Sequence, residues 1–94
     1  MELRISSDAR RIVTESGGKL YIYPGPACCG GTRYVQTSTE EPRQRGGSHV
    51  VAEGGIELWV RPVNGKLPDV LEIVVRGRRR PKLAAYWNGC AFIV

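Results

Sequence analysis

The chain has 94 residues, of which 41% are hydrophobic and 24% charged, and it carries a formal net charge of +5. This size predicts one domain with a single modest core and excludes a second domain. No stretch approaches the roughly 20 apolar residues of a membrane helix, and the first residues lack the apolar run of a signal peptide. We therefore expect a cytoplasmic protein with reduced thiols and no membrane association.

The first predicted element is a short helix near the N-terminus. Ser6 or Ser7 can cap it, and Asp8 lies close to the positive end of its dipole. Gly17-Gly18 should end it. The apolar residues that share one face at helical spacing are Ile5, Ala9, Ile12 and Val13.

The rest of the chain is predicted to form strands and turns. Strands are expected near residues 20–23, 34–37, 49–52, 56–60, 70–75 and 83–87. Gly54-Gly55 indicates a two-residue hairpin between two of them, and the β-branched run 70–75 indicates a central strand. The predicted fold class is α+β and mostly β: a single domain over residues 1–94, with one N-terminal helix packed on antiparallel or mixed sheets.

Three cysteines raise the question of a metal or redox site. Cys28 and Cys29 lie together in a glycine-rich turn, and Cys90 lies 61 residues after Cys29 in another turn that contains glycine. Thiolate sulfur is the preferred ligand for zinc, copper(I) and iron–sulfur clusters, and glycine leaves room around a sulfur. Three thiolates could converge on one metal. Alternatively, one or two of them are small buried hydrophobes.

A cluster of basic residues follows the predicted strand at 70–75. It comprises Arg76, Arg78, Arg79, Arg80 and Lys82. Gly77 and Pro81 indicate that it is a loop, which could dock an acidic protein or could simply be solvated. Binding to nucleic acid is poorly supported because no aromatic residue is interleaved with the arginines.

The other candidate residues favour structural roles, and no enzymatic activity is predicted. His49, the one histidine, is expected at the surface. The aromatic residues at strand spacing are expected in the core and at its rim: Tyr21, Tyr23, Tyr34, Trp59, Tyr86 and Trp87. Neither a Ser-His-Asp arrangement nor a phosphate-binding loop is apparent.

Taken together, several of these segments resemble the A-type iron–sulfur carriers, the HesB/IscA-like family. The segment from Ile5 to Ala9 is similar to the opening strand and helix of that family, and Leu20-Tyr21-Ile22 to its second strand. Cys29-Gly30-Gly31-Thr32-Arg33-Tyr34 fits the family's Cys-x-Gly-x-x-Tyr motif. Asn88-Gly89-Cys90 stands where the family has Cys-Gly-Cys, with Phe92 beyond.

The resemblance implies a HesB-like domain that binds and delivers an iron–sulfur cluster or iron. Cys29 and Cys90 would be ligands, assisted by Cys28, while Asn88 replaces one family cysteine. A [2Fe–2S] cluster is favoured over [4Fe–4S]. The implied partners are a second copy of the chain and a client apo-protein. The basic cluster Arg76–Lys82 and the positive net charge are untypical of the family, and it is the charge of this loop, independently of the resemblance, that predicts contact with an acidic protein.

Three alternatives remain open at the level of the sequence. The chain could be a thiol redox or metal-sensing protein that uses the same three cysteines. It could be an interaction or nucleic-acid-binding module that acts through the loop 76–82. It could also be a divergent relative that has lost the cluster.

Overall fold

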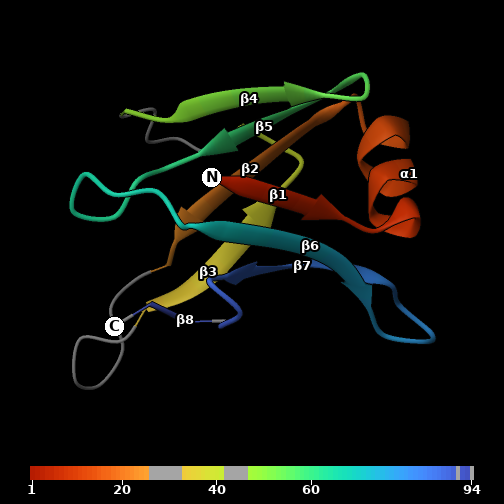
Figure 1. The fold of residues 1–94 in the computed structure, drawn as a ribbon. Coiled ribbons are helices and arrows are strands. Elements are labelled where there is room, and N and C mark those ends of the chain that lie inside the picture. The colour runs from red at the N-terminus through yellow and green to blue at the C-terminus, as the bar shows by residue number, and fades with distance from the viewer. Residues whose placement is uncertain (26–32, 42–46, 91, 94) are drawn as a thin grey trace.

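The computed structural model describes residues 1–25, 33–41, 47–90 and, for the backbone alone, 92–93, and it contains one helix and eight strands in these segments (Figure 1). The elements in chain order are β1 (Glu2–Ile5), α1 (Ser7–Glu15), β2 (Lys19–Pro24), β3 (Arg33–Ser38), β4 (His49–Glu53), β5 (Ile56–Val60), β6 (Val70–Arg76), β7 (Lys82–Trp87) and β8 (Phe92–Ile93). The predicted fold class, mostly β with an N-terminal helix, is confirmed.

Helix α1 begins and ends where the sequence predicts. Ser6 is the N-cap, and its Oγ accepts a hydrogen bond of 3.1 Å from the backbone N–H of Ala9. Two glycines with positive φ, Gly17 and Gly18, follow the last turn, and the Gly18 N–H donates to the Val13 carbonyl at 2.8 Å. Ile5 belongs to β1 rather than to the helix, although it packs against the same core as Ala9 and Val13.

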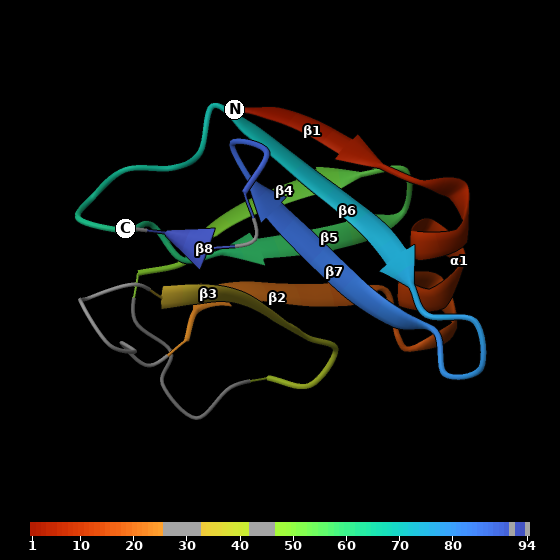
Figure 2. The same cartoon turned by 90° about the horizontal axis from the view of Figure 1, so that it is seen from below.

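The strands form two mixed sheets, as Figures 1 and 2 show. The three-stranded sheet has the order β1-β6-β7, with β1 parallel to β6 and β7 antiparallel to it. The five-stranded sheet has the order β4-β5-β2-β3-β8, in which only the β2–β5 pair is parallel. The run 70–75 is the central strand of its sheet, as predicted.

The hydrophobic core lies between the two sheets, and α1 covers one end of it (Figure 2). Its buried members are Ala9, Val13, Leu20, Ile22, Ile56, Leu58, Val60, Leu71, Ile73, Ala85 and Trp87. Along one edge the sheets are joined directly, because the Thr37 hydroxyl on β3 donates to the Leu83 carbonyl on β7 at 3.2 Å. In the part of the chain that the structure describes, no helix is long and apolar enough to cross a membrane.

The aromatic residues divide between the core and its rim, as expected. Tyr21 and Trp87 are buried, whereas Tyr34 is 58% exposed. Tyr21 faces away from the core on β2, where its ring lies 5.8 Å from that of Trp59. This pair explains why β2 is buried on both faces, with Leu20, Tyr21 and Ile22 all inaccessible.

In the segments that the structure describes, three two-residue β-turns have positive φ at both central positions, which is the signature of a type I′ turn. Gly54-Gly55 forms the predicted hairpin between β4 and β5. Asn64-Gly65 and Asn88-Gly89 form two more, each closed by a pair of backbone hydrogen bonds. The Asn-Gly dipeptide is a strong hairpin signal, so the sequence indicates both hairpins, in addition to the glycine-containing turn predicted at Cys90.

Candidate functional site

Cys90 is the first residue after the tight turn that ends β7. The Trp87 N–H donates to the Cys90 carbonyl at 2.7 Å, and the Cys90 N–H donates back to the Trp87 carbonyl at 3.0 Å. The Cys90 thiol is free and exposed. A rigid hairpin therefore presents this sulfur to solvent, and the alternative of a small buried hydrophobe does not hold for Cys90.

Asn88, in the same turn, has a structural role. Its Oδ1 accepts hydrogen bonds from the backbone N–H groups of Asp69 at 2.7 Å and Val70 at 3.0 Å, while its own N–H donates to the Val70 carbonyl at 2.9 Å. These bonds tie the turn to the start of β6. Thiol sulfur is a weak acceptor, so a cysteine at position 88 would not replace them.

The segment after Cys90 lies beside the strand that follows the other two cysteines. Strand β8 pairs antiparallel with β3, with Tyr34 opposite Phe92. At the same end of β3, the Gly25 N–H donates to the Tyr34 carbonyl at 2.8 Å. Cys28 and Cys29 lie outside the described residues, between these two anchors in the chain. Cys29 precedes β3 by four residues, and Cys90 precedes β8 by two.

The described residues contain no complete set of metal ligands. No three His, Cys, Asp or Glu side chains among them lie close enough to hold one ion. His49 is exposed, as predicted, on β4, which is the opposite edge of the five-stranded sheet from β8. Cys90 is thus the one thiol that the described residues supply, and the ligand set predicted from the sequence depends on Cys28 and Cys29.

The arginine loop, residues 76–82, joins β6 to β7. The register pairs Arg76 with Lys82, so the connection is a short hairpin loop. Gly77 has a φ of 97°, and a Cβ on it would lie 2.7 Å from the Arg80 carbonyl oxygen. The Arg76 guanidinium carbon lies 5.1 Å from the centre of the Tyr86 ring. The loop therefore has a defined, compact conformation, and every residue in it is exposed.

The arginine loop and the Cys90 turn lie at opposite ends of β7 (Figure 1). Strand β7 has six residues, so its two ends are separated by about 17 Å at the usual rise per residue. The two candidate sites are therefore separate surfaces. A partner bound at the arginine loop would touch the Cys90 turn only if it covered that whole length.

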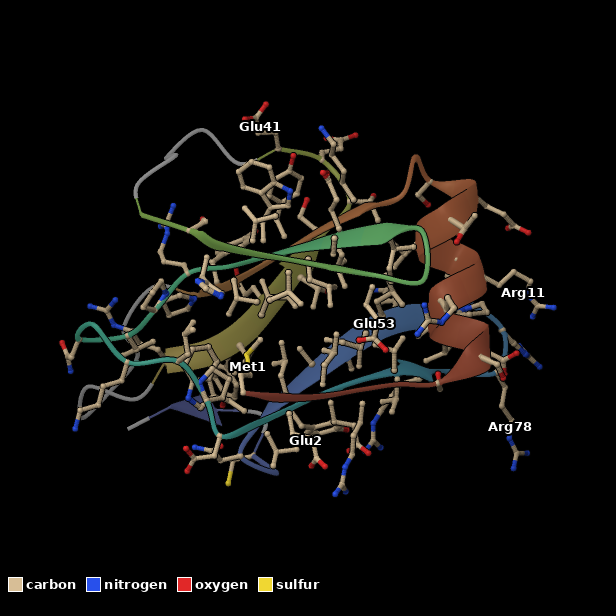
Figure 3. All side chains as sticks on the ribbon, turned by 45° about the horizontal axis from the view of Figure 1, so that its top comes forward. Met1, Glu2, Arg11, Glu41, Glu53 and Arg78 are labelled. Atoms are coloured by element: carbon tan, nitrogen blue, oxygen red, sulfur yellow. The ribbon has the colours of Figure 1, made fainter. Side chains whose placement is uncertain are left out.

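A pocket of about 420 Å³ lies between α1, the three-stranded sheet and the β4–β5 turn, and Cys90 is not among its lining residues. Its charged lining residues include Arg10 and Glu53, which form an ion pair of 3.5 Å. Figure 3 shows Glu53 beside the helix. This ion pair links the helix to the β4–β5 hairpin, so it serves the fold.

No family model, no curated protein and no solved structure matches this chain. The functional interpretation consequently depends on the motif residues and on the geometry described above.

Proposed function

We propose that this protein binds and delivers an iron–sulfur cluster, or iron, through cysteine thiolates. Cys90 and Cys29 are the principal ligands in this proposal, and Cys28 assists them. The cluster is cargo rather than a resident cofactor, and a [2Fe–2S] cluster is the preferred form. Three thiols leave the usual set of four ligands incomplete, so the fourth ligand would come from a second copy of the chain or from a client.

The observation that carries the proposal is the position of the exposed Cys90 thiol. It stands on a fixed turn whose continuation, β8, pairs with the first two residues of β3. The chain segment with Cys28 and Cys29 leads directly into those two residues. This topology favours a thiol site shared between the two segments.

The exposed position of the Cys90 sulfur suits a protein that transfers a cluster better than one that stores it. A cluster held at the surface can be reached by the thiolates of a recipient, and ligand exchange requires such access. Residue 88 is an asparagine whose Oδ1 accepts two backbone hydrogen bonds, so the second C-terminal thiolate of the family that the sequence resembles is replaced here by a structural side chain. A site with fewer thiolates would hold the cluster less tightly.

Anaerobic reconstitution with iron and sulfide tests the proposal. The expected product is a brown protein with visible charge-transfer bands and iron and sulfide in equal amounts. Cys29→Ser and Cys90→Ser should each remove most of the absorption, and Cys28→Ser should remove less. Because Cys90 is exposed, Cys90→Ser should unfold at the same temperature as the parent protein, which separates loss of a ligand from loss of the fold.

Retention of the full spectrum in the Cys29→Ser/Cys90→Ser double variant would refute the proposal. Failure of the parent protein to take up iron, combined with a reversible disulfide that involves Cys90, would replace it with the thiol redox function.

A further inference from the structure

We propose that the arginine loop binds an acidic segment of a partner protein, and that the pocket beside the loop receives an apolar side chain of the same segment. This proposal goes beyond the proposed function and does not depend on it, because the loop and the Cys90 turn are separate surfaces.

The arginine loop accounts for the entire net charge of the protein. It contains five of the 14 lysine and arginine residues and no acidic residue. The nine basic residues in the rest of the chain equal the nine aspartates and glutamates. The rest of the chain therefore has no formal net charge, and the excess of positive charge that would attract an acidic ligand belongs to this loop.

The guanidinium groups at the tip are available for a ligand. Within the described segments, Arg78, Arg79 and Arg80 form no ion pair and no hydrogen bond with any carboxylate. Figure 3 shows the Arg78 side chain extending into solvent, at the α1 end of the molecule where Arg11 also lies. Consecutive guanidinium groups repel one another, and carboxylates bound between them would relieve this repulsion and form bidentate hydrogen bonds.

A pocket of about 440 Å³ adjoins the loop and shares Lys82 with it. It lies between the end of α1, the end of β3 and the start of β7. Ile12 and Leu83, both half-buried, form apolar parts of its wall, and the buried Leu20 lies beneath. The rest of the lining is polar or charged: Ser16 at the end of the helix, Thr37, Ser38, Thr39, Glu40 and Lys82. An acidic segment that enters the pocket would therefore place its apolar side chain against Ile12, Leu20 and Leu83 and its carboxylates on the arginine side, away from Glu40.

The combination of this pocket with a compact basic tip favours a protein segment over an extended polyanion. Duplex DNA presents one charge per about 1.7 Å along its axis and gains affinity from a long basic surface. Here the basic surface is a single short loop, and no aromatic side chain lies between Gly77 and Pro81 for a base to stack on. The pocket at its edge has an apolar part formed by Ile12, Leu20 and Leu83, which contributes nothing to the binding of phosphates but matches an acidic peptide with one hydrophobic anchor.

Fluorescence anisotropy tests the charge requirement with a labelled peptide of alternating glutamate and glycine that carries one central leucine. Binding to the parent protein should weaken steeply between about 50 and 300 mM salt. A triple variant, Arg78→Gln, Arg79→Gln and Arg80→Gln, should lose most of the binding. The matched control, Arg4→Gln, Arg33→Gln and Lys66→Gln, removes the same charge from exposed positions away from the loop and should bind almost as well as the parent.

A second pair of variants tests the pocket. Ser16→Phe should fill it and should abolish the several-fold advantage of the leucine peptide over the same peptide with glycine at its centre. Thr14→Phe places the same side chain on an exposed part of the helix that does not line the pocket, and it should leave that advantage intact.

Three results would overturn the proposal. The first is an equal loss of peptide binding in the two triple variants, which would show that binding depends on the net charge of the protein and not on the position of the arginines. The second is an equal affinity for the leucine and glycine peptides. The third is tighter binding to an arbitrary DNA duplex or to phosphatidylserine vesicles than to the leucine peptide, lost in the Arg78/Arg79/Arg80 variant.

Discussion

Asn88 combines two structural roles in one side chain. Its φ of 52° is in the left-handed region, which asparagine tolerates better than most residues, and its amide oxygen accepts two backbone hydrogen bonds. Asn64 has nearly the same φ, 51°, but no side-chain hydrogen bond within the described part of the chain. A comparison of Asn88 with Asn64 therefore separates the stability that comes from the side-chain hydrogen bonds from the stability that comes from the left-handed backbone conformation.

We expect Asn88→Ala to lower the free energy of unfolding by about 1–2 kcal/mol more than Asn64→Ala does, because only Asn88 loses hydrogen bonds. Chemical denaturation of both variants measures the difference. Equal destabilisation would contradict the role assigned to the Asn88 amide. Asn88→Cys should resemble Asn88→Ala in stability, because a thiol is a poor acceptor.

At the scale of the elements, the conformation of the β6–β7 hairpin depends on one glycine of its loop. A side chain at Gly77 is disfavoured for two reasons. The φ of 97° is rarely adopted by residues other than glycine, and a Cβ would lie too close to the Arg80 carbonyl oxygen. Gly65 lies in another hairpin with a φ of 73° and has open space around it. Both glycines have positive φ, so their main difference is that an added Cβ would collide with the Arg80 backbone at Gly77 and would meet nothing at Gly65.

We expect Gly65→Ala to cost about 1–2 kcal/mol, the penalty of the left-handed conformation, and Gly77→Ala to cost at least about 1 kcal/mol beyond that. Thermal unfolding of the two variants provides the comparison. If Gly77→Ala is no worse than Gly65→Ala, the arginine loop is not held in the compact conformation described here.

The elements also show what the sequence can predict. The cap at Ser6, the helix end at Gly17-Gly18 and the Gly54-Gly55 hairpin depend on neighbouring residues, so local rules identify them. The parallel pairings of β1 with β6 and of β2 with β5 join strands that are far apart in the chain, and no local pattern specifies them. The contact of Asn88 with the start of β6 was invisible for the same reason.

At the scale of the whole molecule, the Cys90 turn and the arginine loop are predicted to act independently. They lie at the two ends of β7, and the net charge resides at one end only. The sequence identified both groups of residues, but their separation became apparent only with the fold. Carriage of a cluster and recognition of an acidic partner would then be properties of different surfaces.

This independence predicts that the Arg78/Arg79/Arg80 glutamine variant keeps the rate at which iodoacetamide alkylates Cys90 in the folded protein, within about twofold, because about 17 Å and solvent screening separate the sites. Mass spectrometry of timed samples measures the rate at Cys90. A large change in the rate of Cys90 alkylation would show that the arginine loop influences the Cys90 turn at the other end of β7.

The central claim, that Cys90 meets the segment containing Cys28 and Cys29, is tested most directly by mapping disulfides after gentle oxidation of the apo protein. A disulfide requires two Cα atoms within about 7 Å of each other. We predict that peptide mapping of the monomeric fraction finds Cys90 linked to Cys29 or Cys28. Cys90 that stays reduced, or that forms only links between two copies through Cys90 itself, would contradict a shared thiol site.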